Sequence, residues 1–168
     1  MNDPGSNKGL HIRPAHREDI GLILELIKGL ASYEKAPEQA KATPQDIEKA
    51  LFQPSPRAHA LICSVDGQPA GFALYFYNFS TWTGKSGVYL EDLFVEPAFR
   101  GYGAGKALLK RLAQIACEQD CARFEWSVLD WNEPAIKFYE AFGAEAQSEW
   151  VGYRLSGEAL KTFANSTD

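Results

Sequence analysis

Hydrophobic residues recur at helical spacing in the first third of the chain. One helical face is formed by Ile20, Ile23, Leu24, Ile27, Leu30 and Ala31. This spacing predicts a helix that ends near Tyr33. Thr43-Pro44-Gln45-Asp46 combines a hydroxyl N-cap, a proline at the first helical position and an acid in the first turn. A second helix should therefore run towards Leu51, and a short edge strand is expected earlier, over residues 11–14.

The middle of the chain reads as antiparallel sheet. Residues 58–65 and 69–79 are rich in aliphatic and aromatic residues, and Asp66-Gly67 between them is typical of a hairpin turn. A polar link over residues 80–87 leads to a predicted central strand over residues 88–95. Its apolar character is interrupted by two acids, which indicates a strand beside something functional.

The last third alternates helical and extended patterns. We expect a helix from Gly103 onwards, a strand over residues 123–129 and a helix over residues 133–142. A last strand over residues 150–155 and a short helix over residues 158–163 would complete the chain. The whole pattern predicts the α/β (α+β) class, with a mixed, mostly antiparallel twisted sheet flanked by helices.

Length, charge and cysteine count narrow the class of protein. A chain of 168 residues with 45% hydrophobic residues fits one domain, residues 1–168, in which the polar residues 1–9 form a flexible tail. A net charge of −5 gives no reason to bind nucleic acid or a membrane. We expect a cytoplasmic protein, since no apolar run or signal sequence is visible. Three cysteines without metal-ligand spacing predict neither a disulfide framework nor a metal site.

A glycine-rich loop between the central strand and the next helix is the strongest functional signal. Gly101, Gly103 and Gly105 allow backbone N–H groups to approach a phosphate, and the dipole of the following helix favours an anion. Lys106 is followed by neither Ser nor Thr, so the loop is not a P-loop, and it lacks the full Rossmann glycine pattern. A flexible turn before a helix is the alternative reading.

The spacing of Arg100, Gly103 and Gly105 resembles the pyrophosphate-binding motif of the GNAT acyltransferases, Arg or Gln-x-x-Gly-x-Gly or Ala. The resemblance extends to the spermidine/spermine (diamine) and thialysine acetyltransferase branch through Ile12–Ala15, Leu30–Glu34, Tyr89–Asp92 and Trp131–Pro134. It implies the GNAT acyl-CoA N-acyltransferase fold, acetyl-CoA as co-substrate without a metal, and transfer of acetyl to a primary amine of a small molecule. That branch usually forms homodimers with C-terminal strands exchanged or packed across the interface.

Two residues are candidates for proton transfer. An alkyl amine is mostly protonated at neutral pH and must lose a proton before it attacks a thioester. Glu91 is the candidate base, acting through water, and its alternative is a structural strand carboxylate. Tyr139 matches the family tyrosine that protonates the leaving thiolate, and its alternative is a packed aromatic.

The resemblance also implies binding residues. The cofactor would contact the end of the central strand, the glycine-rich loop and the start of a later helix: Leu93, Phe94, Val95, Arg100, Gly101, Tyr102, Gly103, Ala104, Gly105, Lys106, Asn132 and Ala135. The amine pocket would be lined by Tyr33, Glu34, Trp82, Glu91 and Asp92, with Asp92 in a structural or substrate-orienting role.

One departure from the family pattern bears on the substrate. The relatives carry acids before the Gly-aromatic-Arg of the last strand, whereas this chain has Trp150-Val151. A long polycation would find fewer anchors, so a diamine or a lysine-like amino acid is at least as plausible. A protein lysine or N-terminal acetyltransferase of the same fold and a noncatalytic CoA-binding sensor remain alternatives.

Overall fold

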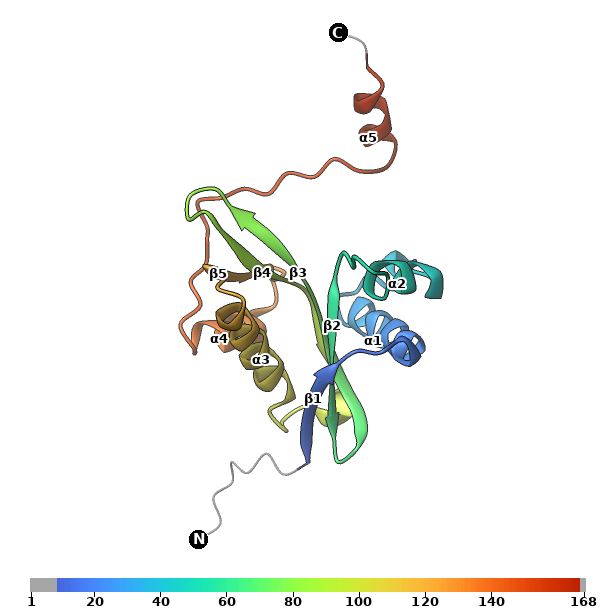
Figure 1. The fold of residues 1–168 in the computed structure, drawn as a ribbon, viewed down its shortest axis with the longest axis vertical. Coiled ribbons are helices and arrows are strands. Elements are labelled where there is room, and N and C mark those ends of the chain that lie inside the picture. Colours follow the sequence, from blue (N-terminus) through green and yellow to red (C-terminus); the bar gives the residue numbers. More distant parts are fainter. Residues whose placement is uncertain (1–8, 167–168) are drawn as a thin grey trace. The chain divides into compact units, whose positions relative to one another are not determined.

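The computed structural model describes residues 9–166, in two compact units. The first unit extends to Ser127 and the second begins at Val128. Each is described by itself below (Figure 1). The predicted flexible tail, residues 1–9, lies outside the described residues except for Gly9.

A five-stranded sheet in the order β1-β2-β3-β4-β5 forms the centre of the first unit. The strands are β1 (Leu10–Pro14), β2 (His59–Val65), β3 (Gln68–Ser80), β4 (Lys85–Val95) and β5 (Arg123–Trp126). The first three pairings are antiparallel, and β4 pairs with β5 in parallel. The predicted mixed, mostly antiparallel sheet is confirmed.

The hairpin formed by β3 and β4 is longer than the sequence predicts. Residues 80–87 were expected to be a polar link, but the structure pairs Ser80 with Lys85 and leaves a turn of only four residues. Gly87 permits this close pairing, because a Cβ at this position would lie 2.5 Å from Asn78 Oδ1. Polar residues therefore continue the strand where their backbone groups still find partners.

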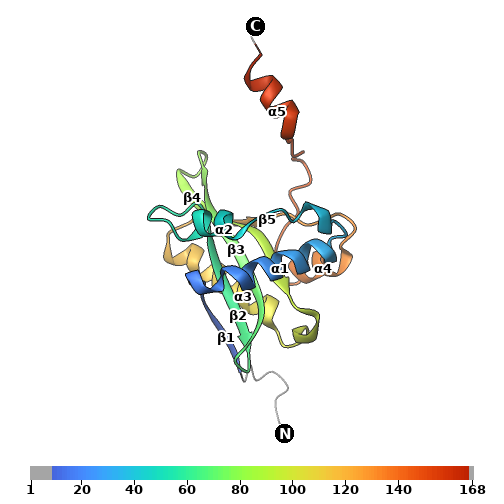
Figure 2. The same ribbon diagram turned by 90° about the vertical axis from the view of Figure 1, so that its right-hand side faces the viewer.

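Helices α1 (Ile20–Tyr33) and α2 (Pro44–Leu51) cover one face of the sheet, in front of the strands in Figure 2. The end of α1 is where the apolar spacing predicts it. A capping box starts α2: the Asp46 N–H donates to Thr43 Oγ1 at 3.3 Å, and the Thr43 N–H donates to Asp46 Oδ2 at 2.9 Å.

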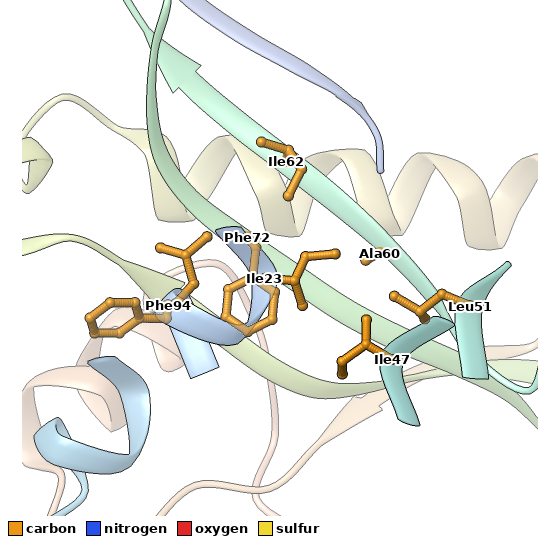
Figure 3. Close-up of a cluster of buried hydrophobic side chains, with 8 residues drawn as sticks. Ile23, Ile47, Leu51, Ala60, Ile62, Phe72 and Phe94 are labelled. Atoms are coloured by element: carbon orange, nitrogen blue, oxygen red, sulfur yellow. The ribbon is translucent and has the colours of Figure 1, made fainter. Parts of the chain in front are cut away.

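Aliphatic side chains from both helices pack against aliphatic and aromatic side chains of the sheet in one buried core (Figure 3). The cluster consists of Ile23, Leu26, Ile47, Leu51, Ala60, Ile62, Phe72 and Phe94. Because side chains alternate along a strand, the intervening residues of β2 face the other side of the sheet. The core thus connects α1 directly to β4, the strand that carries the candidate base.

Helix α3 (Ala104–Glu118) lies on the opposite face of the sheet from α1 and α2 (Figure 1). Its buried side chains include Leu108, Leu109, Leu112 and Ile115, which recur at helical spacing. Short 3-10 turns over Arg17–Asp19, Pro37–Gln39 and Pro97–Phe99 complete this unit. Of the helices that the structure describes, none is long and apolar enough to span a membrane.

An ion pair fixes the start of α1 to the edge strand. Arg13 Nη1 and Nη2 contact the two carboxylate oxygens of Asp19 at 2.6 and 2.8 Å, and the His16 N–H donates to Asp19 Oδ2 at 2.7 Å. Asp19 is buried. The hydrogen bonds from Arg13 and then that from His16 lower the pKa of Asp19 against the opposing effect of burial.

The second unit contains α4 (Glu133–Glu140) and α5 (Gly157–Ala164). Both predicted helices are present, although α4 ends two residues before the expected Phe142. The predicted strand over residues 150–155 is wrong, because this segment pairs with no strand among the described residues. Likewise β5 ends at Trp126 rather than at the expected Leu129. An aromatic, extended sequence becomes a strand only where a neighbouring backbone accepts its hydrogen bonds.

Candidate active site

The end of β4 has an open edge. Pairing with β5 stops at Leu90, opposite Trp126, whereas β4 continues to Val95. The Glu96 N–H donates to Ala70 O of the β3 side at 2.8 Å, so in the alternation of an antiparallel pair the Val95 carbonyl faces away from β3. The backbone groups of Leu93 and Val95 can therefore pair with an extended ligand, which would lie where β5 would continue if it were longer.

A β-bulge sets the conformation of the two acids. Leu74 is opposite Asp92 and Tyr75 is opposite Leu90, so Glu91 is an additional residue of β4 without a partner in β3. A bulge bends the strand and changes the direction of its side chains. The sequence showed the two acids but gave no signal for the bulge.

Glu91, Asp92 and Glu34 form an acidic cluster in the first unit. Burial, followed by the negative charges of Glu91 and Glu34, raises the pKa of Asp92 to about 6. Burial also raises the pKa of Glu34, which follows the last residue of α1. Asp92 therefore interacts electrostatically with both other acids, and the cluster can attract a cationic group.

The glycine-rich loop has the geometry of an anion site. Gly101 and Gly103 have φ angles of +88° and +81°, in the left-handed region that glycine tolerates. The Ala107 N–H makes the first helical hydrogen bond, to Gly103 O at 2.9 Å. The preceding N–H groups of the first turn of α3 therefore remain available to a phosphate.

Arg100 connects this loop to the end of β4 and to α1. Its Nε–H donates to Val95 O at 3.1 Å. Its guanidinium carbon lies 5.0 Å from the ring centre of Tyr33 and 5.9 Å from that of Phe94. Residues predicted for the cofactor and for the amine therefore meet in one place.

Most of the other predicted cofactor residues also belong to the first unit. The loop and the first turn of α3 carry Gly101, Tyr102, Gly103, Ala104, Gly105 and Lys106. A Cβ at Gly105 would lie 3.9 Å from Val95 Cγ2, which places the start of α3 against the end of β4.

One predicted residue of the first unit lies apart from this cluster, and three others belong to the second unit. Trp82 lies in the turn between β3 and β4 and is 89% exposed. At about 3.3 Å per residue, β4 separates that turn from Glu91 by about 20 Å. Asn132, Ala135 and Tyr139 belong to the second unit, where Asn132 is the N-cap residue of α4 and its carbonyl accepts the Ile136 N–H at 3.0 Å. Their assigned roles stay predictions.

Sequence reasoning missed two glycines that shape the site. A Cβ at Gly29 would lie 2.6 Å from Phe94 Cε1, and one at Gly71 would lie 2.4 Å from Phe94 O. Because glycine has no Cβ, α1 and β3 can lie this close to the end of β4. A glycine inside an apolar helix and one inside an apolar strand were the available signals.

A cavity of about 400 Å³ lies elsewhere in the first unit, between α3 and the first three strands. Its lining includes His59, Tyr75, Arg111 and Glu118 but none of the predicted site residues. The acidic cluster, the open strand edge and the anion loop meet instead at the end of β4, which is the candidate active site. Among the described residues, no group of three or more His, Cys, Asp or Glu side chains is arranged to hold a metal ion.

This combination of an open strand end, a glycine-rich loop and a following helix defines the class of protein. The model of the acetyltransferase (GNAT) family matches residues 25–144, and the chain belongs to this family. It is an acetyltransferase, and acetyltransferases of this fold use acetyl-CoA.

Individual relatives indicate which branch of the family the chain resembles. The chain is 37% identical over 164 residues to thialysine N-epsilon-acetyltransferase from Sus scrofa, covering 91% of this chain and 96% of that protein. It is 35% identical to spermidine/spermine N(1)-acetyltransferase-like protein 1 from Homo sapiens, over 91% of this chain and 23% of that protein. A solved structure of an integron cassette protein from the mobile metagenome of V. cholerae matches with a TM-score of 0.76 and 29% identity, over 94% of this chain and 99% of that one.

Proposed function

We propose that the enzyme transfers the acetyl group of acetyl-CoA to the terminal primary amine of a small molecule, with a lysine-like amino acid such as thialysine as the preferred acceptor. The observation that carries this proposal is the cluster of Glu34, Glu91 and Asp92 beside the open edge of β4. A protonated amine would be attracted by the cluster and held next to the strand end where an acyl donor would bind.

The cofactor would bind along the end of β4 and over the glycine-rich loop. Its pantetheine arm would pair with the backbone of Leu93, Phe94 and Val95 in the manner of an added strand. Its pyrophosphate would accept hydrogen bonds from the N–H groups of residues 101–106 and from the Arg100 side chain. Asn132 and Ala135 would contribute further contacts from the start of α4.

The reaction needs one proton acceptor and one proton donor. Glu91 would take a proton from the ammonium group through a water molecule, which leaves a nucleophilic amine. The amine nitrogen would attack the thioester carbonyl carbon, and a backbone N–H at the end of β4 would stabilise the negative charge on the carbonyl oxygen. When the C–S bond breaks, Tyr139 would give its phenolic proton to the departing thiolate, and the remaining proton that the nitrogen loses as the amide forms would return the Tyr139 phenolate to the neutral phenol. The products are the N-acetylated amine and free CoA.

The acids of the cluster lie at one end of β4, which favours a small acceptor. The three carboxylates belong to the end of α1 and the bulge of β4, whereas Trp82 lies at the far end of the hairpin. The chain also has Trp150-Val151 where polyamine-acetylating relatives carry acids. A lysine-like amino acid places one ammonium group in the cluster without requiring a second acidic anchor far away. The thialysine relative, matched over nearly its whole length, supports the same choice.

Release of the CoA thiol from acetyl-CoA tests this proposal directly. The purified chain would be assayed with thialysine, lysine, putrescine, spermidine, spermine and a lysine-containing peptide at equal concentrations. We expect the highest kcat/KM with thialysine or lysine. Polyamines as the best acceptors would show that acids at 150 and 151 are not needed for a polycation.

Two other outcomes would contradict the proposed activity. Turnover of the peptide without turnover of small amines would identify a protein acetyltransferase of the same fold. Binding of acetyl-CoA without turnover of any acceptor would favour the noncatalytic sensor. A Glu91→Gln variant serves as the control, because thiol release that persists in this variant is not catalysed through Glu91.

We further propose that residues 1–168 act as a single GNAT domain and that the enzyme is a cytoplasmic homodimer. The family match supports the single domain, since residues 25–144 extend across both compact units. The resemblance to the polyamine and thialysine acetyltransferase branch, which usually forms homodimers, supports the dimer. Sedimentation equilibrium of the full chain measures the assembly, and a monomer at micromolar concentration would refute the dimer.

A further inference from the structure

Arg100 makes three contacts that its predicted role in phosphate binding does not require. Its Nε–H donates to Val95 O, and its guanidinium group lies over the rings of Tyr33 and Phe94. Its terminal Nη groups have no hydrogen-bond acceptor among the described residues. The side chain is thus held by a carbonyl and two aromatic faces, without an anionic partner.

Each of these partners belongs to one of the two substrate sites. The Val95 carbonyl faces the open edge of β4, where the pantetheine arm would pair. Tyr33 is the last residue of α1, and Glu34 of the acidic cluster follows it directly. Arg100 therefore contacts a backbone carbonyl of the proposed cofactor site, Val95 O, and an aromatic side chain of the proposed amine site, Tyr33.

We propose that Arg100 is a latch between the two sites. In the free enzyme it holds Tyr33 and occupies Val95 O. When the cofactor binds, its pyrophosphate draws the guanidinium group away from both. Charge-assisted hydrogen bonds from the guanidinium group to phosphate, together with pairing of the pantetheine arm to the released Val95 carbonyl, offset the loss of the hydrogen bond to Val95 O and of the contact with the Tyr33 ring. This inference rests on the proposed function only in requiring that CoA binds at the glycine-rich loop.

The latch predicts a change in the affinity for CoA that would not occur if Arg100 stayed in contact with Tyr33 when CoA binds. If cofactor binding must break the contact between Arg100 and Tyr33, removal of the Tyr33 ring should strengthen CoA binding. A cation over an exposed ring contributes enough to change an equilibrium constant by about two- to fivefold. By linkage, CoA should also change the affinity for the amine, because Arg100 releases the residue next to Glu34.

Isothermal titration with CoA measures the first effect. We expect Tyr33→Leu to lower the Kd for CoA by about two- to fivefold, and Tyr33→Phe, which keeps the ring, to match the wild type. Tyr77→Leu is the matched control, since Tyr77 and Tyr33 are 41% and 40% exposed and Tyr77 contacts His59 and Tyr75 instead. If Tyr33→Leu does not fold, as judged by its thermal transition, Tyr33→Met replaces it.

A double-mutant cycle assigns the effect to Arg100. In an Arg100→Ala background, which should bind CoA more weakly, Tyr33→Leu should change the Kd no further. Unchanged or weaker CoA binding in Tyr33→Leu would overturn the latch, and so would the same strengthening in both backgrounds. Failure of the wild type to bind CoA would overturn the proposed function as well. Normal CoA binding and amine turnover without the Tyr33→Leu effect would overturn the latch alone.

Discussion

Replacement of Asp92 by Asn should stabilise the fold at neutral pH, because the folded protein disfavours the ionised form of this carboxyl group. Its pKa is raised from 3.8 to about 6 by burial and by the charges of Glu91 and Glu34. At 1.36 kcal/mol per pKa unit, the ionised form is disfavoured by about 3 kcal/mol relative to the unfolded chain. Because Asp92 is only half-buried and solvent screens part of this cost, we expect Asp92→Asn to raise the free energy of unfolding by about 1–2 kcal/mol at pH 7.

The magnitude of the stabilisation by Asp92→Asn depends on pH in a defined way. Below about pH 4 the Asp92 carboxyl is protonated in both the folded and the unfolded state, so its ionisation contributes nothing. Between about pH 4 and pH 6 the unfolded chain loses this proton first, and the stability of the wild type falls. Above about pH 6 the free-energy cost of ionised Asp92 in the folded protein is constant. The difference in stability between variant and wild type should therefore grow between pH 4 and pH 6.

Urea unfolding at pH 4, 5, 6 and 7 measures this difference. Asp19→Asn is the control of opposite sign, because hydrogen bonds from Arg13 and His16 lower the pKa of Asp19. That variant should be less stable than the wild type at pH 7, and its deficit should shrink as acid protonates the folded carboxyl. The reasoning about Asp92 is refuted if Asp92→Asn is less stable than the wild type at pH 7, or if its effect is the same at pH 4 and pH 7.

The Asp92→Asn variant should also bind the amine substrate more weakly than the wild type. A protonated acceptor is attracted by the Asp92 carboxylate, so in the wild type the KM for the amine should rise as the pH falls below about 6. In Asp92→Asn the KM should be higher at pH 7 and should lack this inflection. A pH profile of KM that is identical in both proteins would remove Asp92 from the amine site.

Three further substitutions test other parts of the site. Tyr139→Phe should lower kcat by about a hundredfold or more with little change in the Kd for acetyl-CoA, because the hydroxyl acts on the leaving thiolate. An unchanged kcat would exclude this role. Gly103→Val should weaken CoA binding at least about tenfold, since a β-branched residue is strained at a φ of +81°; titration calorimetry showing normal affinity would rule out the phosphate loop. Gly71→Ala should lower the free energy of unfolding by about 1–3 kcal/mol, because its Cβ would lie 2.4 Å from Phe94 O. A urea midpoint equal to that of the wild type would show that β4 moves away without cost.

Local signals in the sequence located most elements of the first unit. The apolar spacing of Ile20 to Ala31 determines where α1 runs, since a helix with this pattern has only one face that can enter the core. The capping residues Thr43 and Asp46 determine the start of α2. Asp66-Gly67 determines the hairpin between β2 and β3, because both residues adopt positive φ there. The motif of Arg100, Gly103 and Gly105 indicated the family that the comparison with known proteins confirms.

Tertiary structure alone decided the features that depend on contacts between distant segments. The bulge at Glu91 follows from the register between β3 and β4, and a register is set by the packing of whole strands. The pKa of Asp92 is raised mainly by burial, then by Glu91 and by Glu34, which lies far away in the sequence. Residues 150–155 have the composition of a strand but pair with no strand among the described residues. Arg100 lies over both Tyr33 of α1 and Phe94 of β4, two residues that are distant in the sequence. Short-range signals thus specify the elements and the chemistry available, whereas burial and charge at the site arise only when those elements come together.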